Sequence, residues 1–378
     1  MKTLIVVTHL LGTGHLARAL VLARAFCAAG HRVIVASGGM PAPHLKSDGV
    51  ELLQLPPLRS DGVNFRTLLD RQGAPVSGSL LAERKEKLLD TLHEFRPDVL
   101  LTELFPFGRR VLAEEFTSLL TAAQALTPVI CTSVRDILAP PSKPAKARMA
   151  DDLIERFYTA ILVHSDAAIT PLATSWPVSA AWADKLRYTG FVAPGAAGPH
   201  PDALGEGEIL VTSGGGSVGM QLFETAIAAA ALAPEHRWRV LVGGDDAPAR
   251  IARLRSDAPP NAEICSTSPG FRQMLNHASA SVSFCGYNTA LDILQAGTPA
   301  VFVPFDDGGE VEQSLRASTL SNLPGIEVLR TQDLSADTLL QKLRTAIAAP
   351  PRPKRTDGFH GAAETVRIVT QLLSEHSA

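Results

Sequence analysis

Two glycine-rich turns, each preceded by a buried strand and followed by a helix, constrain this fold most. The first is GTGHLA at residues 12–17, after the apolar run 4–7. The second is SGGGSVG at residues 213–219, after the apolar run 208–212. A strand that enters a glycine turn and then a helix opens a doubly wound α/β domain. Two such openings, about 200 residues apart, predict two domains.

Along the chain, short apolar strands alternate with helical patterns. Such alternation predicts parallel sheets covered by helices on both faces. Strands are expected at residues 4–7, 31–36, 51–55, 97–101, 127–133, 167–170, 208–213, 238–242, 281–284 and 299–303. Helices are expected at about 83–95 and, last in the chain, 361–374. The fold class is therefore α/β, with two doubly wound Rossmann-like domains facing across a cleft.

A segment rich in glycine, proline and alanine, residues 189–205, has the composition of a linker. We therefore place an amino-terminal domain at 1–195 and a carboxyl-terminal domain at 196–378. The last helix either closes the second domain or packs back on the first.

Composition excludes several classes of protein. The 378 residues exceed what one hydrophobic core usually serves. A formal net charge of −3 argues against a nucleic-acid binder. Four separated cysteines form no CxxC pair, which fits a reducing compartment. The sequence has no apolar run long enough for a spanning helix, and the start is interpreted as a first strand, not a signal peptide. These features predict a cytoplasmic protein.

The first glycine turn also fits the dinucleotide-binding pattern GxGxxA. A nicotinamide enzyme needs an acidic residue at the end of the second strand, where this chain has VIVASGG at residues 33–39. A dehydrogenase is therefore disfavoured. His15 lies in this turn, where the crevice of a doubly wound sheet opens, and is a candidate functional residue.

A third motif, CGYNTALD at residues 285–292, follows the strand at 281–284 and begins a helix at a glycine. The carboxylate of Asp292 is either a satisfied helix residue or an acceptor for ribose hydroxyls. The acidic loop at 306–313 comes after a strand, where such sheets bind ligands. Carboxylates suit Mg²⁺, but the chain has no DxD arrangement, so we predict neither a metal nor a cofactor.

Together these motifs resemble the GT-B glycosyltransferases. The pattern is most similar to the branch that contains the lipid-linked N-acetylglucosaminyltransferase of peptidoglycan synthesis. LLGTGH at residues 10–15 matches the family's GGTGGH turn, and GGSVG at 215–219 matches its GGSxG donor loop. PGFRQM at 269–274 resembles the segment that reads the nucleobase.

The resemblance implies that a nucleotide-sugar donor is bound mainly by the glycine loops, the nucleobase segment and the helix after Gly286. Its donor-binding residues would be Gly12, Gly14, Gly215, Gly216, Ser217, Gly219, Phe271, Gly286, Asn288, Thr289, Asp292, Glu312 and Gln313. The branch implies uridine as the base, with deoxythymidine next.

The chain also departs from this branch. TGFVAP at residues 189–194 stands where relatives carry TGNP and a basic residue, so the phosphate contact of that basic residue is not expected here. TELFPFGRR at 102–110 and SVRD at 133–136 resemble a separate group of bacterial predicted glycosyltransferases. The acceptor is therefore not expected to be the peptidoglycan lipid.

The predicted activity is metal-independent, inverting transfer of a sugar from a nucleotide-diphosphate sugar, with UDP as the expected nucleotide, to a hydroxyl acceptor. His15 is the first choice for the base because its reference pKa of about 6.5 suits neutral pH. Glu103 and Asp136 are alternatives. Phe105, Arg109 and Arg135 are candidate contacts for a small or lipid-linked acceptor, with peripheral contact to the inner membrane face.

Two alternatives remain open. Nucleotide-sugar hydrolases and 2-epimerases use the same fold without transfer to an acceptor. A nucleotide-sugar-binding protein without catalysis is less consistent with the presence of His15, the GGSVG loop and Asp292.

Overall fold

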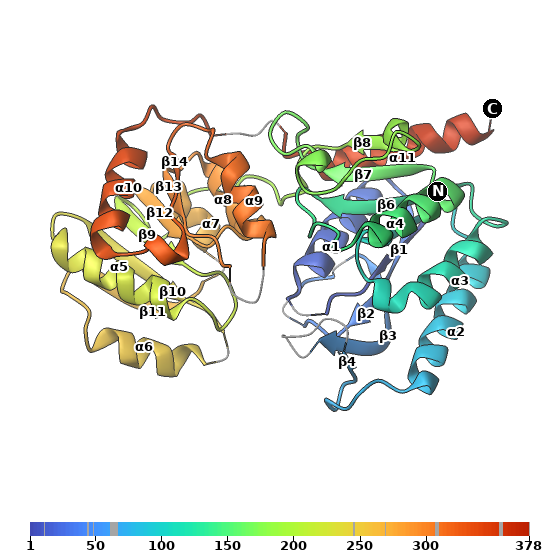
Figure 1. Ribbon diagram of the computed structural model, residues 1–378, viewed down its shortest axis with the longest axis horizontal. Helices are drawn as coiled ribbons and strands as arrows, with labels where there is room; N and C mark the ends of the chain where they lie inside the picture. Colours follow the sequence, from blue (N-terminus) through green and yellow to red (C-terminus); the bar gives the residue numbers. More distant parts are fainter. Residues whose placement is uncertain are drawn as a thin grey trace. The chain divides into compact units, whose positions relative to one another are not determined.

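The computed structural model describes residues 1–10, 12–43, 45–47, 49–60, 67–244, 246–268, 270–306, 310–354 and 358–377. The chain forms two compact units: Met1–Pro194 together with the chain from His360 onward, and Gly195–Phe359. Each unit is a sheet flanked by helices (Figure 1).

The first unit contains an eight-stranded sheet in the order β4-β3-β2-β1-β5-β6-β7-β8. Its strands are β1 (Lys2–Val7), β2 (Arg32–Gly39), β3 (Glu51–Ser60), β4 (Leu68–Leu69), β5 (Val99–Glu103), β6 (Val129–Arg135), β7 (Ala160–His164) and β8 (Leu186–Tyr188). Its helices are α1 (Gly14–Ala28), α2 (Gly78–Phe95), α3 (Ala113–Ala123), α4 (Pro144–Phe157) and α11 (Gly361–Ser377). All neighbouring strands pair in parallel except β3 and β4.

Strand β1 shows why this sheet is covered on both faces. Successive side chains of a strand point to opposite faces. Leu4 and Val6 join one apolar core with residues of α2, α3 and α4. Ile5 and Val7 join the other with residues of α1 and α11. The continuous apolar run is therefore the signature of a strand buried twice.

The second unit contains a six-stranded sheet in the order β11-β10-β9-β12-β13-β14, parallel throughout. Its strands are β9 (Glu208–Thr212), β10 (Arg237–Val242), β11 (Ala262–Ser266), β12 (Ala280–Ser283), β13 (Ala300–Phe302) and β14 (Ile326–Val328). Its helices are α5 (Met220–Leu232), α6 (Ala247–Arg255), α7 (Phe271–Leu275), α8 (Tyr287–Ala296), α9 (Glu312–Leu320) and α10 (Ala336–Ala348).

The last helix, α11, packs on the first unit. Val369 and Leu372 of α11 lie in the same apolar core as Ile5 and Val129. The chain returns through a backbone bridge between Val192 and His360. Of the two positions considered for this helix, the structure adopts the one on the first domain.

The strand expected at residues 167–170 is wrong. These residues form a turn in which Asp166 Oδ1 accepts the Ala168 amide at 2.9 Å, and the Asp166 carbonyl accepts the Thr170 amide at 2.8 Å. A carboxylate that bonds the backbone two residues later favours a turn over a strand. The buried strand in this part of the chain is β7, which ends at His164, two residues before Asp166.

Candidate active site

His15 and Glu103 meet at the topological switch point of the first sheet. The chain runs outward from β1 to β4 on one side and from β5 to β8 on the other. A crevice opens where two such neighbouring strands end. His15 lies in the first turn of α1, just after β1, and Glu103 ends β5. His15 Nδ1 is 2.9 Å from Glu103 Oε1, so residues 88 positions apart form a pair.

Arg18, one turn after His15 on α1, donates to the same oxygen, Glu103 Oε1. Burial raises the pKa of the Glu103 carboxyl, but His15 and Arg18 outweigh it, and the pKa lies well below its usual range. Burial lowers the pKa of His15 to about 4, more than Glu103 raises it. Near neutral pH, Glu103 is therefore an anion and His15 is neutral.

These charges determine the tautomer of His15. An ionised carboxylate only accepts hydrogen bonds, so Nδ1 carries the proton that Glu103 accepts. The lone pair is then on Nε2, where it can take a proton from another group. The His15 side chain is 15% exposed and Glu103 is 1% exposed, so the imidazole is the member of the pair that a ligand reaches more readily.

Arg109 and Arg135 also act on this pair, because the charges of both lower the pKa of His15. Arg109 follows β5, and its Nε donates to the carbonyl of Thr8 at 2.5 Å. Arg135 ends β6, the next strand in the sheet. Asp136 is 1% exposed, and its Oδ1 accepts the Ile137 amide at 2.7 Å, which stabilises the turn after β6.

Phe105 is a core residue and not an acceptor contact. Its side chain is fully buried, and its ring stacks on Phe116 of α3 with centroids 4.6 Å apart. Burial of an aromatic ring against α3 stabilises the loop after β5 by removing apolar area from water. The aromatic residue in the sequence motif thus belongs to packing.

A buried histidine that was not predicted from the sequence lies beside this site. His164, at the end of β7, is fully buried between Ser133 Oγ, 2.7 Å from Nε2, and Thr189 Oγ1, 2.8 Å from Nδ1. Burial lowers the pKa of His164 to about 3. Two hydroxyls can donate or accept, so they satisfy a neutral imidazole. Nothing in the local pattern LVHSD distinguishes this histidine from a strand end.

The second glycine loop lies at the switch point of the second sheet, after β9 and beside β12. Gly215, Gly216 and Ser217 are exposed, and a side chain added at Gly215 would meet no atom within 4 Å. Helix α5 begins after Gly219, whose φ of 95° is in the left-handed region that favours glycine. Ser217 therefore does not cap α5, and its hydroxyl bonds Asp246.

A second glycine pair, Gly243 and Gly244 after β10, packs against this loop. This pair was not predicted from the sequence. A Cβ at Gly243 would lie 2.4 Å from the carbonyl oxygen of Gly214. Arg250 of α6 joins the two turns, because its guanidinium donates to the carbonyls of Gly243 at 3.0 Å and Val218 at 2.8 Å. The buried Arg250 thus links the loop at residues 213–219 to the turn at Gly243 and Gly244.

The helix expected after Gly286 is α8, with Gly286 as its N-cap, Asn288 exposed and Thr289 half-buried in its first turn. Asp292 lies on α8, and its Oδ1 is 2.7 Å from Nε of Arg272 on α7. Burial raises the pKa of Asp292 to about 6, although Arg272 lowers it. Phe271, half-buried, precedes Arg272 and starts α7.

Glu312 and Gln313 begin α9, after β13. The Gln313 side-chain oxygen accepts the Phe305 amide at 3.2 Å, which ties α9 to the end of the preceding loop. Residues 307–309 of the acidic loop, Leu11 of the first glycine turn and Pro269 of the nucleobase segment lie outside the described residues.

Gly12 and Gly14 precede and begin α1, whose N-cap is Thr13. A side chain added at Gly12 would meet no atom within 4 Å, so the turn leaves space beside His15. The glycine there is compatible with close approach of a ligand to the backbone.

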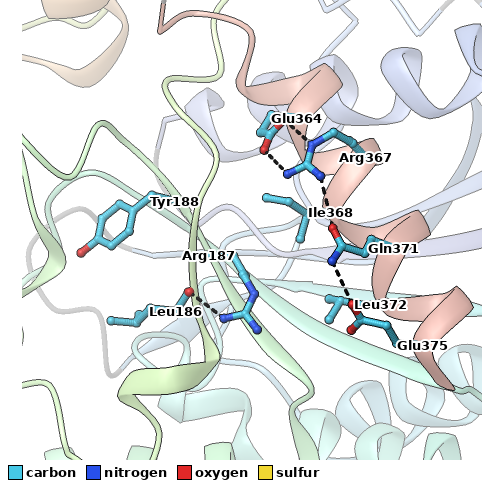
Figure 2. Close-up of a pocket in the computed structure, with 9 residues that line it drawn as sticks. All are labelled: Leu186, Arg187, Tyr188, Glu364, Arg367, Ile368, Gln371, Leu372 and Glu375. Atoms are coloured by element: carbon cyan, nitrogen blue, oxygen red, sulfur yellow. Dashed lines mark hydrogen bonds and ion pairs between the residues drawn. The ribbon is translucent and has the colours of Figure 1, made fainter.

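A cavity of about 240 Å³ lies elsewhere on the first unit, between β8 and α11, and contains none of the predicted site residues (Figure 2). Its polar wall is a ladder on α11 in which Arg367 pairs with Glu364 and bonds Gln371. Within the described ranges, no three His, Cys, Asp or Glu side chains are grouped as metal ligands. Among those same residues, the helices are too short or too polar to cross a bilayer.

Comparison with known proteins shows what the chain is similar to. Residues 209–369 match the model of the glycosyltransferase family 28 C-terminal domain. The chain is 33% identical over 189 residues to the UDP-N-acetylglucosamine–N-acetylmuramyl-(pentapeptide) pyrophosphoryl-undecaprenol N-acetylglucosamine transferase of Brucella canis, covering 46% of this chain and 48% of the relative. The Brucella melitensis protein of the same name is 33% identical over 184 residues, 45% of this chain and 47% of the relative. The chain thus aligns with about half the length of these curated relatives.

Solved structures extend the likeness to the whole fold. The glycosyltransferase VinC, solved in complex with DTDP, superposes with a TM-score of 0.63 at 16% identity, over 99% of this chain and all of that one. MurG of Acinetobacter baumannii gives a TM-score of 0.61 at 16% identity, over 100% of this chain and 99% of that one. Such identities show a shared fold only. The chain therefore has the two-domain GT-B fold expected from its sequence, and its residues 209–369 are similar to the glycosyltransferase family 28 C-terminal domain.

Proposed function

We propose that this protein is a glycosyltransferase that moves a sugar from a UDP-linked donor to a hydroxyl group of an acceptor. The observation that carries the proposal is the His15–Glu103 hydrogen bond of 2.9 Å, in a chain whose residues 209–369 match a glycosyltransferase domain. The relatives named as UDP-N-acetylglucosamine transferases support the uridine donor.

The donor is assigned to the second unit. The exposed backbone of Gly215, Gly216 and Ser217 offers N–H groups to a diphosphate, and Gly286 opens a second helix beside it. Phe271, Asn288, Thr289, Asp292, Glu312 and Gln313 are proposed to hold the nucleoside and sugar. Partial positive charge at the start of α8 would stabilise the departing diphosphate, so no metal is required in this proposal.

His15 is the proposed base. Its Nε2 takes the proton of the acceptor hydroxyl as the acceptor oxygen attacks the anomeric carbon. The bond from that carbon to the diphosphate breaks, and the diphosphate leaves with the electron pair. A single displacement of this kind inverts the configuration at the anomeric carbon. The Glu103 carboxylate stabilises the imidazolium that forms.

The first experiment is a thermal-shift screen of the full chain with nucleotides and nucleotide sugars. A ligand that binds only the folded state raises its stability. We expect UDP and UDP-sugars to raise Tm, and adenine nucleotides to leave it unchanged. Incubation of the best UDP-sugar with labelled acceptor pools, with and without EDTA, then tests transfer and metal independence. Release of free sugar or of an epimer without acceptor would identify a hydrolase or epimerase instead.

Replacing His15 by alanine tests the base. Removal of a general base typically slows turnover by about 10²–10⁴. We expect His15→Ala to reduce turnover in this range while UDP, bound by the second unit, keeps its affinity in calorimetry. Turnover of His15→Ala within threefold of the wild type would refute the assignment.

A further inference from the structure

Arg109 occupies a loop whose backbone is held in an unfavourable conformation. Leu104 and Arg109 have φ angles of 68° and 57°, in the left-handed region that non-glycine residues rarely adopt. The loop is fixed by a hydrogen bond from Leu104 N to Ser133 O at 2.9 Å and another from Gly108 N to Leu104 O at 2.8 Å. Such a conformation is unfavourable for a residue with a side chain and persists where the surrounding structure imposes it.

This loop brings a third guanidinium to a site that holds few anions. Arg18, Arg109 and Arg135 all lie within electrostatic range of the His15–Glu103 pair. Glu103 is the carboxylate that pairs with His15, Asp136 follows Arg135 in the chain, and His15 is neutral. Three guanidinium groups and two carboxylates, Glu103 and Asp136, leave one positive charge in excess among these groups.

The contacts identify which arginine carries the excess. Glu103 Oε1 accepts from Arg18, which satisfies that ion pair. Arg109 uses only Nε, toward the carbonyl of Thr8. Its two Nη atoms make no hydrogen bond or ion pair with any residue in the described part of the chain, although the side chain is half-buried. A guanidinium in this state is suited to bidentate binding of a phosphate or carboxylate.

We infer that the acceptor carries an oxyanion, a phosphate or carboxylate, which Arg109 binds while the acceptor's hydroxyl lies at His15 Nε2. This inference rests on the proposed transferase function and specifies its acceptor class. The same chemistry is offered by a small phosphorylated alcohol and by a phospholipid head group. Arg109 is then a specificity residue, and the strain of its loop fixes the guanidinium next to the base.

The test uses the full chain saturated with UDP, so that the donor's diphosphate site is filled before any other anion is added. Glycerol 3-phosphate and glycerol are titrated into this complex by calorimetry. We expect saturable binding of glycerol 3-phosphate and none of glycerol. Arg109→Met should weaken glycerol 3-phosphate binding at least tenfold, and Arg109→Lys, which keeps the charge, should weaken it less.

Arg110→Met is the matched control, because Arg110 lies in the same loop and donates to the Phe107 carbonyl without acting on His15. It should bind glycerol 3-phosphate within twofold of the wild type. Equal losses in the Arg109 and Arg110 variants would overturn the inference, since the loop itself would then be responsible. So would UDP binding without any binding of glycerol 3-phosphate. Failure to bind UDP would instead count against the proposed donor.

Sedimentation with phosphatidylglycerol and phosphatidylcholine vesicles distinguishes the two sources of the oxyanion. Binding to phosphatidylglycerol alone, lost in Arg109→Met and kept in Arg110→Met, supports a lipid-borne phosphate. Equal sedimentation of all variants, with glycerol 3-phosphate binding still dependent on Arg109, supports a free phosphorylated acceptor.

Discussion

At the scale of single residues, one carboxylate oxygen organises the proposed base. Glu103 Oε1 accepts from both His15 and Arg18. Arg18 keeps this carboxyl ionised, and the ionised carboxyl in turn keeps the His15 proton on Nδ1. Arg18 is thus a positioning residue, which acts on His15 through Glu103 and also lies 3.5 Å from His15 Nδ1.

Glu103→Gln tests this arrangement. The amide removes the negative charge that favours the imidazolium, so we expect turnover to fall by about 10²–10³. The variant also removes the carboxylate that pairs with the buried Arg18 cation, and it should unfold at lower temperature. Turnover is therefore measured below the Tm of the variant. Glu114→Gln, at an exposed carboxylate paired with Lys85, should change neither property; wild-type turnover in Glu103→Gln would contradict the proposal.

His164 predicts how stability depends on pH. Burial lowers its pKa to about 3 in the folded protein, whereas an unfolded histidine titrates near 6.5. Between these values the unfolded state binds a proton that the folded state does not. The free energy of unfolding should therefore fall as pH is lowered from about 6.5, by roughly 1.4 kcal/mol per pH unit for this residue.

Urea unfolding of His164→Gln at several pH values measures this effect. The glutamine keeps polar groups between Ser133 and Thr189 but cannot be protonated, so the slope below pH 6.5 should decrease by one proton. His93→Gln, at an exposed position, should keep the wild-type slope. An unchanged slope in His164→Gln would show that another group causes the pH dependence.

At the scale of elements, the donor loops depend on a residue outside them. Arg250 joins the Gly243 and Val218 carbonyls from α6 and is 8% exposed. Arg250→Met should loosen both turns and weaken UDP binding about tenfold in calorimetry, because ordering the loops on binding then costs conformational entropy. Arg253→Met, on the same helix but exposed, should bind UDP as the wild type does. Equal affinities in the two variants would remove Arg250 from the donor site.

Local pattern predicted most elements but failed where a polar side chain decided the backbone. The two predicted strands before the glycine turns are present in the structure as β1 and β9. Their apolar patterns predict strands reliably because both strands are buried. The pattern of residues 167–170 predicts a strand, but in the structure the Asp166 carboxylate closes a turn there. Asx turns of this kind depend on geometry that composition does not encode.

At the scale of the whole molecule, helix α11 packs in the core of the first unit, although it follows the second unit in the sequence. Val369 is fully buried in the core of the first unit. Val369→Ala should destabilise that unit by roughly 1–3 kcal/mol. Hydrogen exchange should show faster exchange in β1 and β6, with β9 and β12 unchanged. Thr370→Ala, exposed on the same helix, is the control, and equal acceleration in both units would contradict this division of the core.

The sequence by itself determined the fold class, the two glycine turns and the candidate residues His15, Glu103 and Arg109. These follow from periodicity, glycine conformation and the order of strands, which are local or nearly local properties. Only the tertiary structure decided that His15 forms a hydrogen bond with Glu103, that Phe105 is buried, and that His164 and Arg250 lie beside the candidate sites. Each of these depends on contacts between elements far apart in the chain, and burial there alters both side-chain pairing and pKa.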